Sequence, residues 1–242
     1  DISISYISES IRIYESDTDE IVIKEYMNRE DEDLFAKISQ QGGTLRIQNG
    51  RRNFMSFNFR AKVEIYLPTS YHGALAVGST SGSIKLEPSY QLKSIGLSSV
   101  SGSIKAQELE AETITLSSTS GSIQVQKADG LISASSVSGS IRIEDGARGG
   151  TFSTTSGSIR VTLSQVDSDV SLSSVSGSLR LYIPEDSSFK LSAHSVSGSI
   201  HTGFDGDLVY EKSHSASGTV GSNPAFSVEM NTTSGSIRIN ND

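Results

Sequence analysis

The stretch Ser-Ser-Val-Ser-Gly-Ser-Ile-Arg-Ile at residues 135–143 contains the motif that decides how this chain folds. Its centre is Ser-Gly-Ser or Ser-Gly-Thr followed by Ile, Leu or Val, and the chain repeats it nine times at intervals of 17 to 21 residues. The glycines of the nine copies are Gly82, Gly102, Gly121, Gly139, Gly157, Gly177, Gly198, Gly218 and Gly235. A fixed period of this length, in short β-type runs broken by Gly and Ser, is typical of proteins that stack one repeat on the next.

The residues on both sides of each glycine alternate between apolar and polar side chains, which is the pattern of a half-buried strand. Two residues after the glycine, every copy is apolar. This position holds Ile84, Ile104, Ile123, Ile141, Ile159, Leu179, Ile200, Val220 and Ile237. The alternation does not continue across the Ser-Gly step, because the apolar Leu97 and Ile104 are seven residues apart. We therefore expect a bend at each glycine, which either adopts a positive φ or packs backbone against backbone.

A single copy is too small to bury its own apolar side chains, whereas stacked copies place Ile on Ile and form a continuous core. We therefore predict an all-β fold: a single-chain β-solenoid of the parallel β-helix type, with about nine regular rungs roughly 4.8 Å apart. A sandwich or meander of hairpins is the alternative. It explains the alternation of apolar and polar residues, but not the recurrence of the same side chains in every copy.

The two ends of the repeat array are less regular than its middle. We predict that residues 1–70 form a β-rich N-terminal cap with irregular first rungs, and that residues 71–242 form the regular solenoid, continuous with the cap as one domain. Residues 8–13 and 43–47 resemble degenerate copies of the rung. The eighth copy should interrupt the stack, because its inward positions are poorly apolar. They are Glu211, Ser213, Ala216 and Ser222.

The residue three places after each glycine should point outward, and in seven of the nine copies it is basic or His. The seven are Lys85, Lys105, Arg142, Arg160, Arg180, His201 and Arg238. Two interpretations are open. The column is either a solvated face whose cations keep strand surfaces from pairing, or a linear binding site for an anionic polymer. A wall polymer, an acidic glycan or lipid head groups would have the required charge.

Catalytic and metal-binding patterns are weak in this chain. The alternative function, a surface polysaccharide-active enzyme on a β-helix scaffold, needs paired carboxylates that converge on a groove. The sequence predicts no cluster of acids from rung to rung beyond Asp205 with Asp207. His194 and His214 both fall four places before a glycine and could stack as neighbours, but two imidazoles alone make an incomplete metal site. We expect no catalytic residues, no metal and no cofactor.

Composition narrows the class of partner. The formal net charge of −8 disfavours nucleic-acid binding, which needs clustered Lys and Arg on a basic domain. With no Cys, the chain has no disulfide or thiolate chemistry. No apolar stretch approaches the ~18 residues that span a bilayer, and no signal-peptide pattern stands at Asp1. A leader or anchor is therefore expected upstream of the sequence.

Three features together resemble a known family: residues 63–68 (Val-Glu-Ile-Tyr-Leu-Pro), residues 77–84 and the repeated Ser-Val-Ser-Gly-Ser-Ile. They are similar to the bacterial "putative adhesin" β-repeat family of unknown function, and the likeness extends from about Ile2 to Ile239. That family often has Ser-Gly-Asp-Ile where this chain has Ser-Gly-Ser-Ile, so a regular acidic column is missing here. The resemblance implies an extracellular or cell-envelope module for binding or structure, not an enzyme. Its partner would be an anionic cell-wall polymer, a glycan, lipid head groups or another surface protein.

Overall fold

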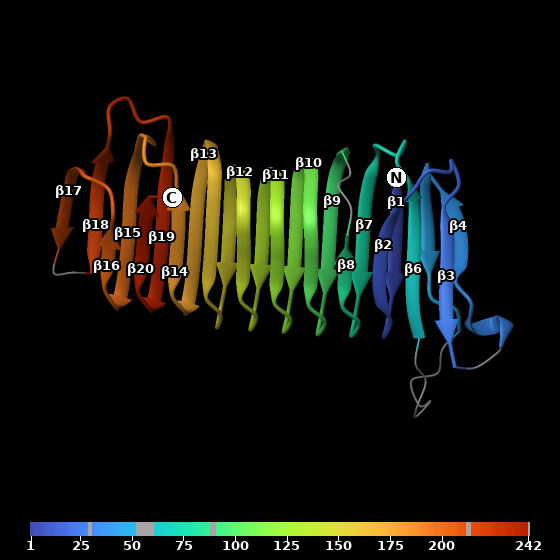
Figure 1. Cartoon of the computed structure of the whole chain (residues 1–242). Helices are drawn as coiled ribbons and strands as arrows, with labels where there is room; N and C mark the ends of the chain where they lie inside the picture. Colours follow the sequence, from blue (N-terminus) through green and yellow to red (C-terminus); the bar gives the residue numbers. More distant parts are fainter. Residues whose placement is uncertain (29–30, 52–60, 88–90, 212–213, 242) are drawn as a thin grey trace.

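The computed structural model describes residues 1–28, 31–51, 61–87, 91–211 and 214–241. It contains twenty β-strands and one 3-10 turn, Glu32–Leu34. The strands lie side by side in one long stack, and the chain advances along its axis from one end to the other (Figure 1). Nearly all pairings between rungs are parallel, which confirms the predicted β-solenoid. None of the described residues belongs to a helix with the length and hydrophobicity to cross a membrane.

Each regular rung contributes one strand segment to each of two hydrogen-bonded ladders. The first ladder contains the segments before the Ser-Gly-Ser turns. Its order is β4 (Lys37–Gln41), β5 (Thr44–Gln48), β1 (Ile2–Tyr6), β7 (Ala74–Ser79), β9 (Gln91–Ser99), β10 (Ile104–Ser118), β11 (Ile123–Ser136), β12 (Ile141–Thr154), β13 (Ile159–Ser176), β19 (Phe226–Ser234), β15 (Phe189–Ser197), β18 (Ser215–Val220) and β17 (Gly206–Glu211).

The second ladder contains the segments that follow the turns. Its order is β3 (Val22–Met27), β6 (Ala61–Pro68), β2 (Ser10–Ser16), β8 (Ile84–Leu86), the N-terminal halves of β10 to β13, then β14 (Leu179–Ile183), β20 (Ile237–Asn241) and β16 (Ile200–Thr202). The long strands β10 to β13 therefore belong to both ladders.

The core lies between the two ladders and consists of vertical files of apolar side chains. Ile123 pairs with Ile141, and Ile141 pairs with Ile159, so equivalent residues lie directly on one another as predicted. All three are buried. The file contains Val63, Ile11, Ile84, Ile104, Ile123, Ile141, Ile159, Leu179, Ile237 and Ile200.

The turn glycines are needed for close contact between rungs, not for a positive φ, which none of the stacked ones has. A Cβ atom at Gly139 would lie 2.0 Å from the carbonyl oxygen of Gly121 in the preceding rung. The buried Ser136 stabilises the same turn, because its Oγ accepts from the Gly139 N–H at 2.9 Å and donates to the Gly121 carbonyl at 3.4 Å. A Ser or Thr occupies this position in rung after rung, so a buried hydroxyl file joins the glycine turns.

The order of the rungs differs from the order of the sequence at both ends. The ninth copy, β19–β20, lies between the rungs of the sixth and seventh copies. At the other end β1–β2 lies between β5–β6 and β7–β8, as the blue strands in Figure 1 show. Both insertions place a strand between two parallel neighbours, so neither terminal rung is an edge of the solenoid.

Three expectations about irregular copies can be compared with these pairings. The interruption at the eighth copy is confirmed, because β18 runs antiparallel to both β15 and β17; Ser213 lies outside the described residues. Residues 8–13 are a true rung copy, in which Glu9 takes the place of glycine against Gly82. For residues 43–47 the prediction was wrong. Leu45 pairs with Ile2, so this segment belongs to the ladder before the turn.

Candidate binding face

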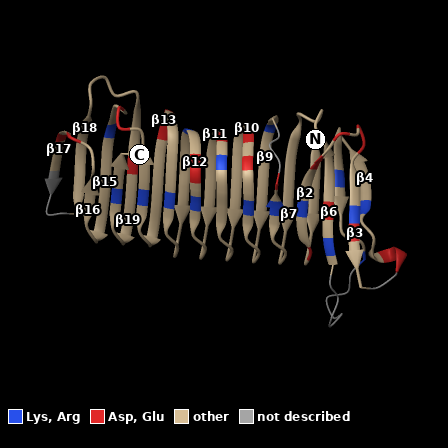
Figure 2. Cartoon of the chain, viewed as in Figure 1, with Lys and Arg blue, Asp and Glu red and all other residues tan. Residues whose placement is uncertain are grey.

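The seven basic or His residues singled out in the sequence form one continuous file on the outer side of the second ladder. Backbone register gives their order as Lys85, Lys105, Gln124, Arg142, Arg160, Arg180, Arg238 and His201. Arg238 precedes His201 because β20 is inserted before β16. Figure 2 shows the cations as a band of blue segments at one height along successive strands. We call this file, with Arg12 described next, the basic face.

Arg12 is a member of the file that the sequence analysis missed. It pairs with Lys85 in the neighbouring rung, three residues after Glu9, the residue that replaces the turn glycine. Aligning residues 8–13 on Glu9 would have identified it. A hydrogen bond with Tyr14 raises the pKa of Arg12, so its guanidinium stays charged.

Glu64 interrupts the file of cations on the N-terminal side, where it lies in register between Arg12 and Lys24. Its carboxylate is buried and accepts hydrogen bonds from Lys62 Nζ at 2.5 Å, Tyr26 Oη at 3.0 Å and Tyr66 Oη at 3.2 Å. These donors, Lys62 first, lower the pKa of Glu64. The acid is therefore ionised and already has partners, and it limits the extent of the basic face.

Only part of the positive charge is neutralised within the face. Lys85 pairs with Glu87 at 2.6 Å, and Arg142 pairs with Glu144, two residues further along the same strand in each case. Within the described part of the chain, Lys105, Arg180 and Arg238 have no acidic side chain within ion-pair distance. The guanidinium of Arg160 lies 4.8 Å from the centre of the Tyr182 ring.

The balance of charge on this face is opposite to that of the whole chain. From Lys85 to Arg238 the file holds six cations, and the next outward file holds two carboxylates. Four positive charges thus remain on one side of a chain whose formal net charge is −8. Because the six cations lie in a line, their field extends along the axis of the solenoid.

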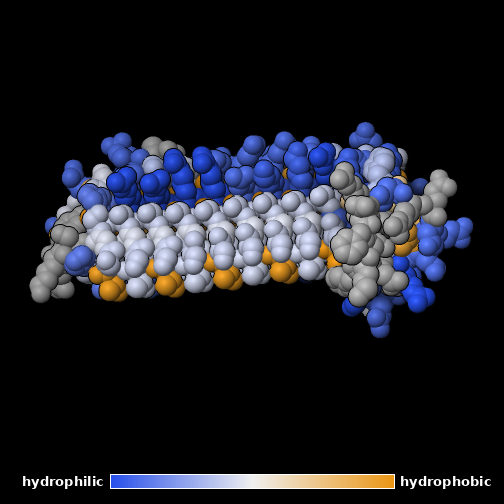
Figure 3. Space-filling view, turned by 90° about the horizontal axis from the view of Figure 1, so that it is seen from below, coloured by the Kyte–Doolittle hydropathy of each residue, from blue (hydrophilic) through white to orange (hydrophobic). Residues whose placement is uncertain are grey.

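Two rows of polar side chains flank the cations. On the turn side lies a row of serines: Ser83, Ser103, Ser122, Ser140, Ser158, Ser178 and Ser236. Seen from below, the edge formed by the turns is a flat, pale surface of small residues between hydrophilic side chains on one margin and hydrophobic ones on the other (Figure 3). Val100, Val137 and Val175, each two residues before a turn glycine, are exposed.

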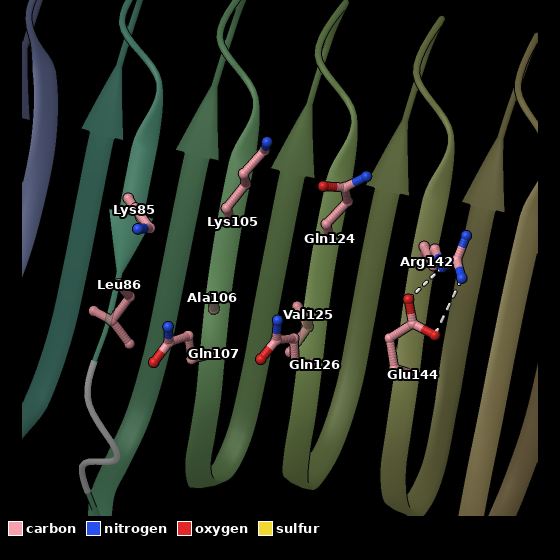
Figure 4. A pocket seen from close by; sticks show the side chains of 10 residues that line it. All are labelled: Lys85, Leu86, Lys105, Ala106, Gln107, Gln124, Val125, Gln126, Arg142 and Glu144. Carbon is pink, nitrogen blue, oxygen red and sulfur yellow. Dashed lines mark hydrogen bonds and ion pairs between the residues drawn. The ribbon is translucent and has the colours of Figure 1, made fainter.

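The row on the other side of the cations contains Gln107, Gln126 and Glu144 (Figure 4). Together with the cations these side chains line a shallow depression of about 300 Å³ across four rungs. The close-up shows Lys85, Lys105, Gln124 and Arg142 at one level and the amides at the next. The face therefore offers cations together with neutral hydrogen-bonding groups.

The two histidines considered as a metal pair do not stack. His194 has Asn231 and Ser215 as its neighbours in register, and His214 Nδ1 is hydrogen-bonded to the Gly198 carbonyl oxygen at 2.8 Å. Among the described residues, no group of three or more His, Cys, Asp or Glu side chains is placed to hold a metal ion.

Comparison with known proteins places this geometry in a family. The family model described as Toastrack DUF4097 matches residues 1–240. A solved structure from Bacteroides fragilis, described as a "putative adhesin", is 14% identical, with 100% of this chain and 92% of that chain covered and a TM-score of 0.52. One from Parabacteroides distasonis with the same description is 13% identical, with coverage of 99% and 92% and a TM-score of 0.52. At these identities the likeness shows a shared fold. No curated protein matches the chain.

Proposed function

The chain belongs to the Toastrack family, and we propose that it is a non-enzymatic binding module of the bacterial cell envelope that holds an anionic polymer along its basic face. The observation that carries this proposal is the file of six cations from Lys85 to Arg238, which only two carboxylates offset. The adhesin descriptions of the two solved structures support a place at the cell surface.

The spacing of the file favours a polymeric partner over a small ion. Two unit charges one rung apart repel by a little under ~1 kcal/mol in water. Arg160 and Arg180 each have a cation on both sides. A polyanion along the axis replaces this repulsion with several attractions at once and releases bound counterions. A single small anion neutralises one or two cations and leaves the rest of the file unchanged.

Reversal of three central charges tests the proposal. The variant combines Arg142→Glu, Arg160→Glu and Arg180→Glu, and the readout is retention on an immobilised polyanion at low salt. A matched control combines Arg46→Glu, Lys93→Glu and Lys190→Glu, three exposed cations of the first ladder, so that both proteins have the same net charge. We expect the first variant to lose retention and the control to keep most of it. Equal retention of both would show that net charge, not the file, governs binding.

The same polymers distinguish a binding module from an enzyme. Incubation of the protein with each polyanion should leave the chain-length distribution of the polymer unchanged. Glu87 and Glu144, the carboxylates beside the cations, are each engaged in an ion pair with a cation on the same strand. Release of shorter products that stopped in a Glu144→Gln variant would replace the binding proposal with a surface hydrolase or lyase.

A further inference from the structure

We propose that the polymer is a linear acidic polysaccharide of the polyuronate class, with one carboxylate on each sugar, lying parallel to the solenoid axis. This inference rests on the proposed function, since it names the ligand of the same basic face. Three features of the face support a polyuronate: the repeat of the cations, the neutral hydrogen-bonding side chains beside them and the tyrosines near its two ends.

The repeat of the cations matches a polymer whose charge recurs with every sugar. The file presents one position per rung, and the step between rungs is that of ordinary strands, roughly 4.8 Å. One sugar of an extended polysaccharide is about as long as this step. Arg160, Arg180 and Arg238 lie on three consecutive rungs, and no acidic side chain of the described residues pairs with any of them. Successive carboxylates can each meet a guanidinium there, the group that binds carboxylates with two parallel hydrogen bonds.

The neutral side chains in the rows beside the cations fit the hydroxyl groups of sugars. Serine hydroxyls lie along one side of the file, and the amides of Gln107 and Gln126 lie along the other. Gln124 puts a third amide within the file itself (Figure 4). Amides and hydroxyls both donate and accept, as the hydroxyls of a glycan require. A polyphosphate chain has no hydroxyls for these groups to recognise, so the rows favour a glycan.

Tyrosines stand near both ends of the row that contains the amides. Tyr182 is half-buried on the rung of Arg180, with the Arg160 guanidinium against its ring. At the other end Tyr14 is also half-buried and stacks on Tyr66 with ring centres 5.2 Å apart. Flat aromatic rings offer apolar surface to the C–H faces of sugar rings. Tyr14 and Tyr182 are six rungs apart, roughly 29 Å at the usual strand spacing, so about seven sugars would extend from one to the other.

The experiment is calorimetric titration of the full chain with three probes: oligogalacturonates of three to ten sugars, the same oligomers methyl-esterified, and polyphosphate of matched charge. Affinity for the free oligogalacturonates should rise with length up to about seven sugars and then level off. The esterified oligomers, which lack the charge, should not bind. The variant Tyr182→Ala should weaken binding of the seven-sugar oligomer roughly two- to tenfold and leave the affinity for polyphosphate unchanged. The variant Tyr182→Phe, which keeps the aromatic ring, should bind the oligomer as the wild type does.

The outcomes separate this inference from the proposed function. Tight binding of polyphosphate without binding of oligogalacturonates would overturn the polyuronate assignment and leave the anionic-polymer proposal standing. The assignment would also be overturned if Tyr182→Ala had no effect on oligogalacturonate affinity, or weakened both polymers equally. If neither polymer bound the wild-type chain at low salt, both proposals would be wrong. Thermal unfolding of each Tyr182 variant verifies that a loss of affinity does not come from a loss of fold.

Discussion

Replacement of a turn glycine by alanine should destabilise the solenoid far more than the addition of one methyl group usually does. At Gly139 the new Cβ would lie 2.0 Å from the carbonyl oxygen of Gly121 and 2.6 Å from its carbonyl carbon. Ordinary contacts of a Cβ begin at 3.4 Å. Both nearest atoms are backbone, so the overlap cannot be relieved by turning a side chain. The two rungs must separate locally by more than 1 Å.

The size of the effect follows from the hydrogen bonds beside this contact. The Ser138 N–H donates to the Thr119 carbonyl oxygen at 2.8 Å, and the Ile123 N–H donates to the Ser140 carbonyl oxygen at 2.9 Å. Ser136 Oγ donates to the carbonyl oxygen of Gly121, the atom that the new Cβ would meet, at 3.4 Å. A separation of this size weakens all three, and a typical net contribution of 0.5–1.5 kcal/mol each gives a loss of about 1.5–4.5 kcal/mol. At about 2–4 °C per kcal/mol for a chain of this length, that corresponds to roughly 3–18 °C in Tm.

Urea and thermal unfolding, followed by circular dichroism, measure this loss, and Gly96→Ala is the matched control. Gly96 lies inside a strand, has no positive φ, and a Cβ there would meet nothing nearer than the Leu75 carbonyl oxygen at 4.0 Å. The control should unfold at or slightly above the wild-type midpoint, because alanine lowers the entropy of the unfolded chain. Equal midpoints for Gly139→Ala and Gly96→Ala would refute the close-contact explanation of the motif.

Three further substitutions test other parts of the structure. Ser136→Ala should lower the free energy of unfolding, measured in urea, by about 1–2 kcal/mol, because the Gly139 N–H loses its acceptor. Ser136→Thr should leave it nearly unchanged, since two other rungs have Thr at this position. Phe152→Ala should lower stability by about 3–5 kcal/mol, because the ring is fully buried between the ladders; a smaller loss would indicate a core that collapses around the cavity. The Ser227 N–H donates to Asp169 Oδ1 at 2.7 Å, and this hydrogen bond lowers the pKa of Asp169. The bond therefore stabilises the fold at neutral pH, and its contribution is lost as the pH falls below about 4 and the carboxylate is protonated. The gap in Tm between wild type and Asp169→Asn should therefore narrow on acidification, and a constant gap from pH 7 to pH 3 would argue against it.

The architecture was predictable because inward and outward positions depend on local alternation. Ile141 and Arg142 must lie on opposite sides of any strand that contains both, and a period shared by many copies stacks like residues on one another. The same reasoning predicted the basic face. Arg12 was not predicted, because its rung has Glu9 where the other rungs have glycine, and the copies were aligned on their glycines.

The order of the rungs was not predictable from the same pattern. Nearly every rung offers the same surface to its neighbours, an Ile or Leu file beside a Ser file, so any rung can follow any other. The ninth copy therefore pairs as well with β13–β14 and β15–β16 as a rung next in sequence would. The ion pairs of Glu87 and Glu144 also depend on side-chain reach, which the alternation of residues does not determine.

The insertion of β19–β20 between rungs formed earlier in the chain has a consequence for biogenesis. A polypeptide that leaves a ribosome or an export channel with its N-terminus first can add β10 to β14 in sequence, each on a finished template. It cannot add β15–β16 next to β13–β14 in the final arrangement, because β19–β20, which are synthesised later, occupy that position. The rungs β15–β16 and β19–β20 must therefore close together, after nearly the whole polypeptide has been delivered.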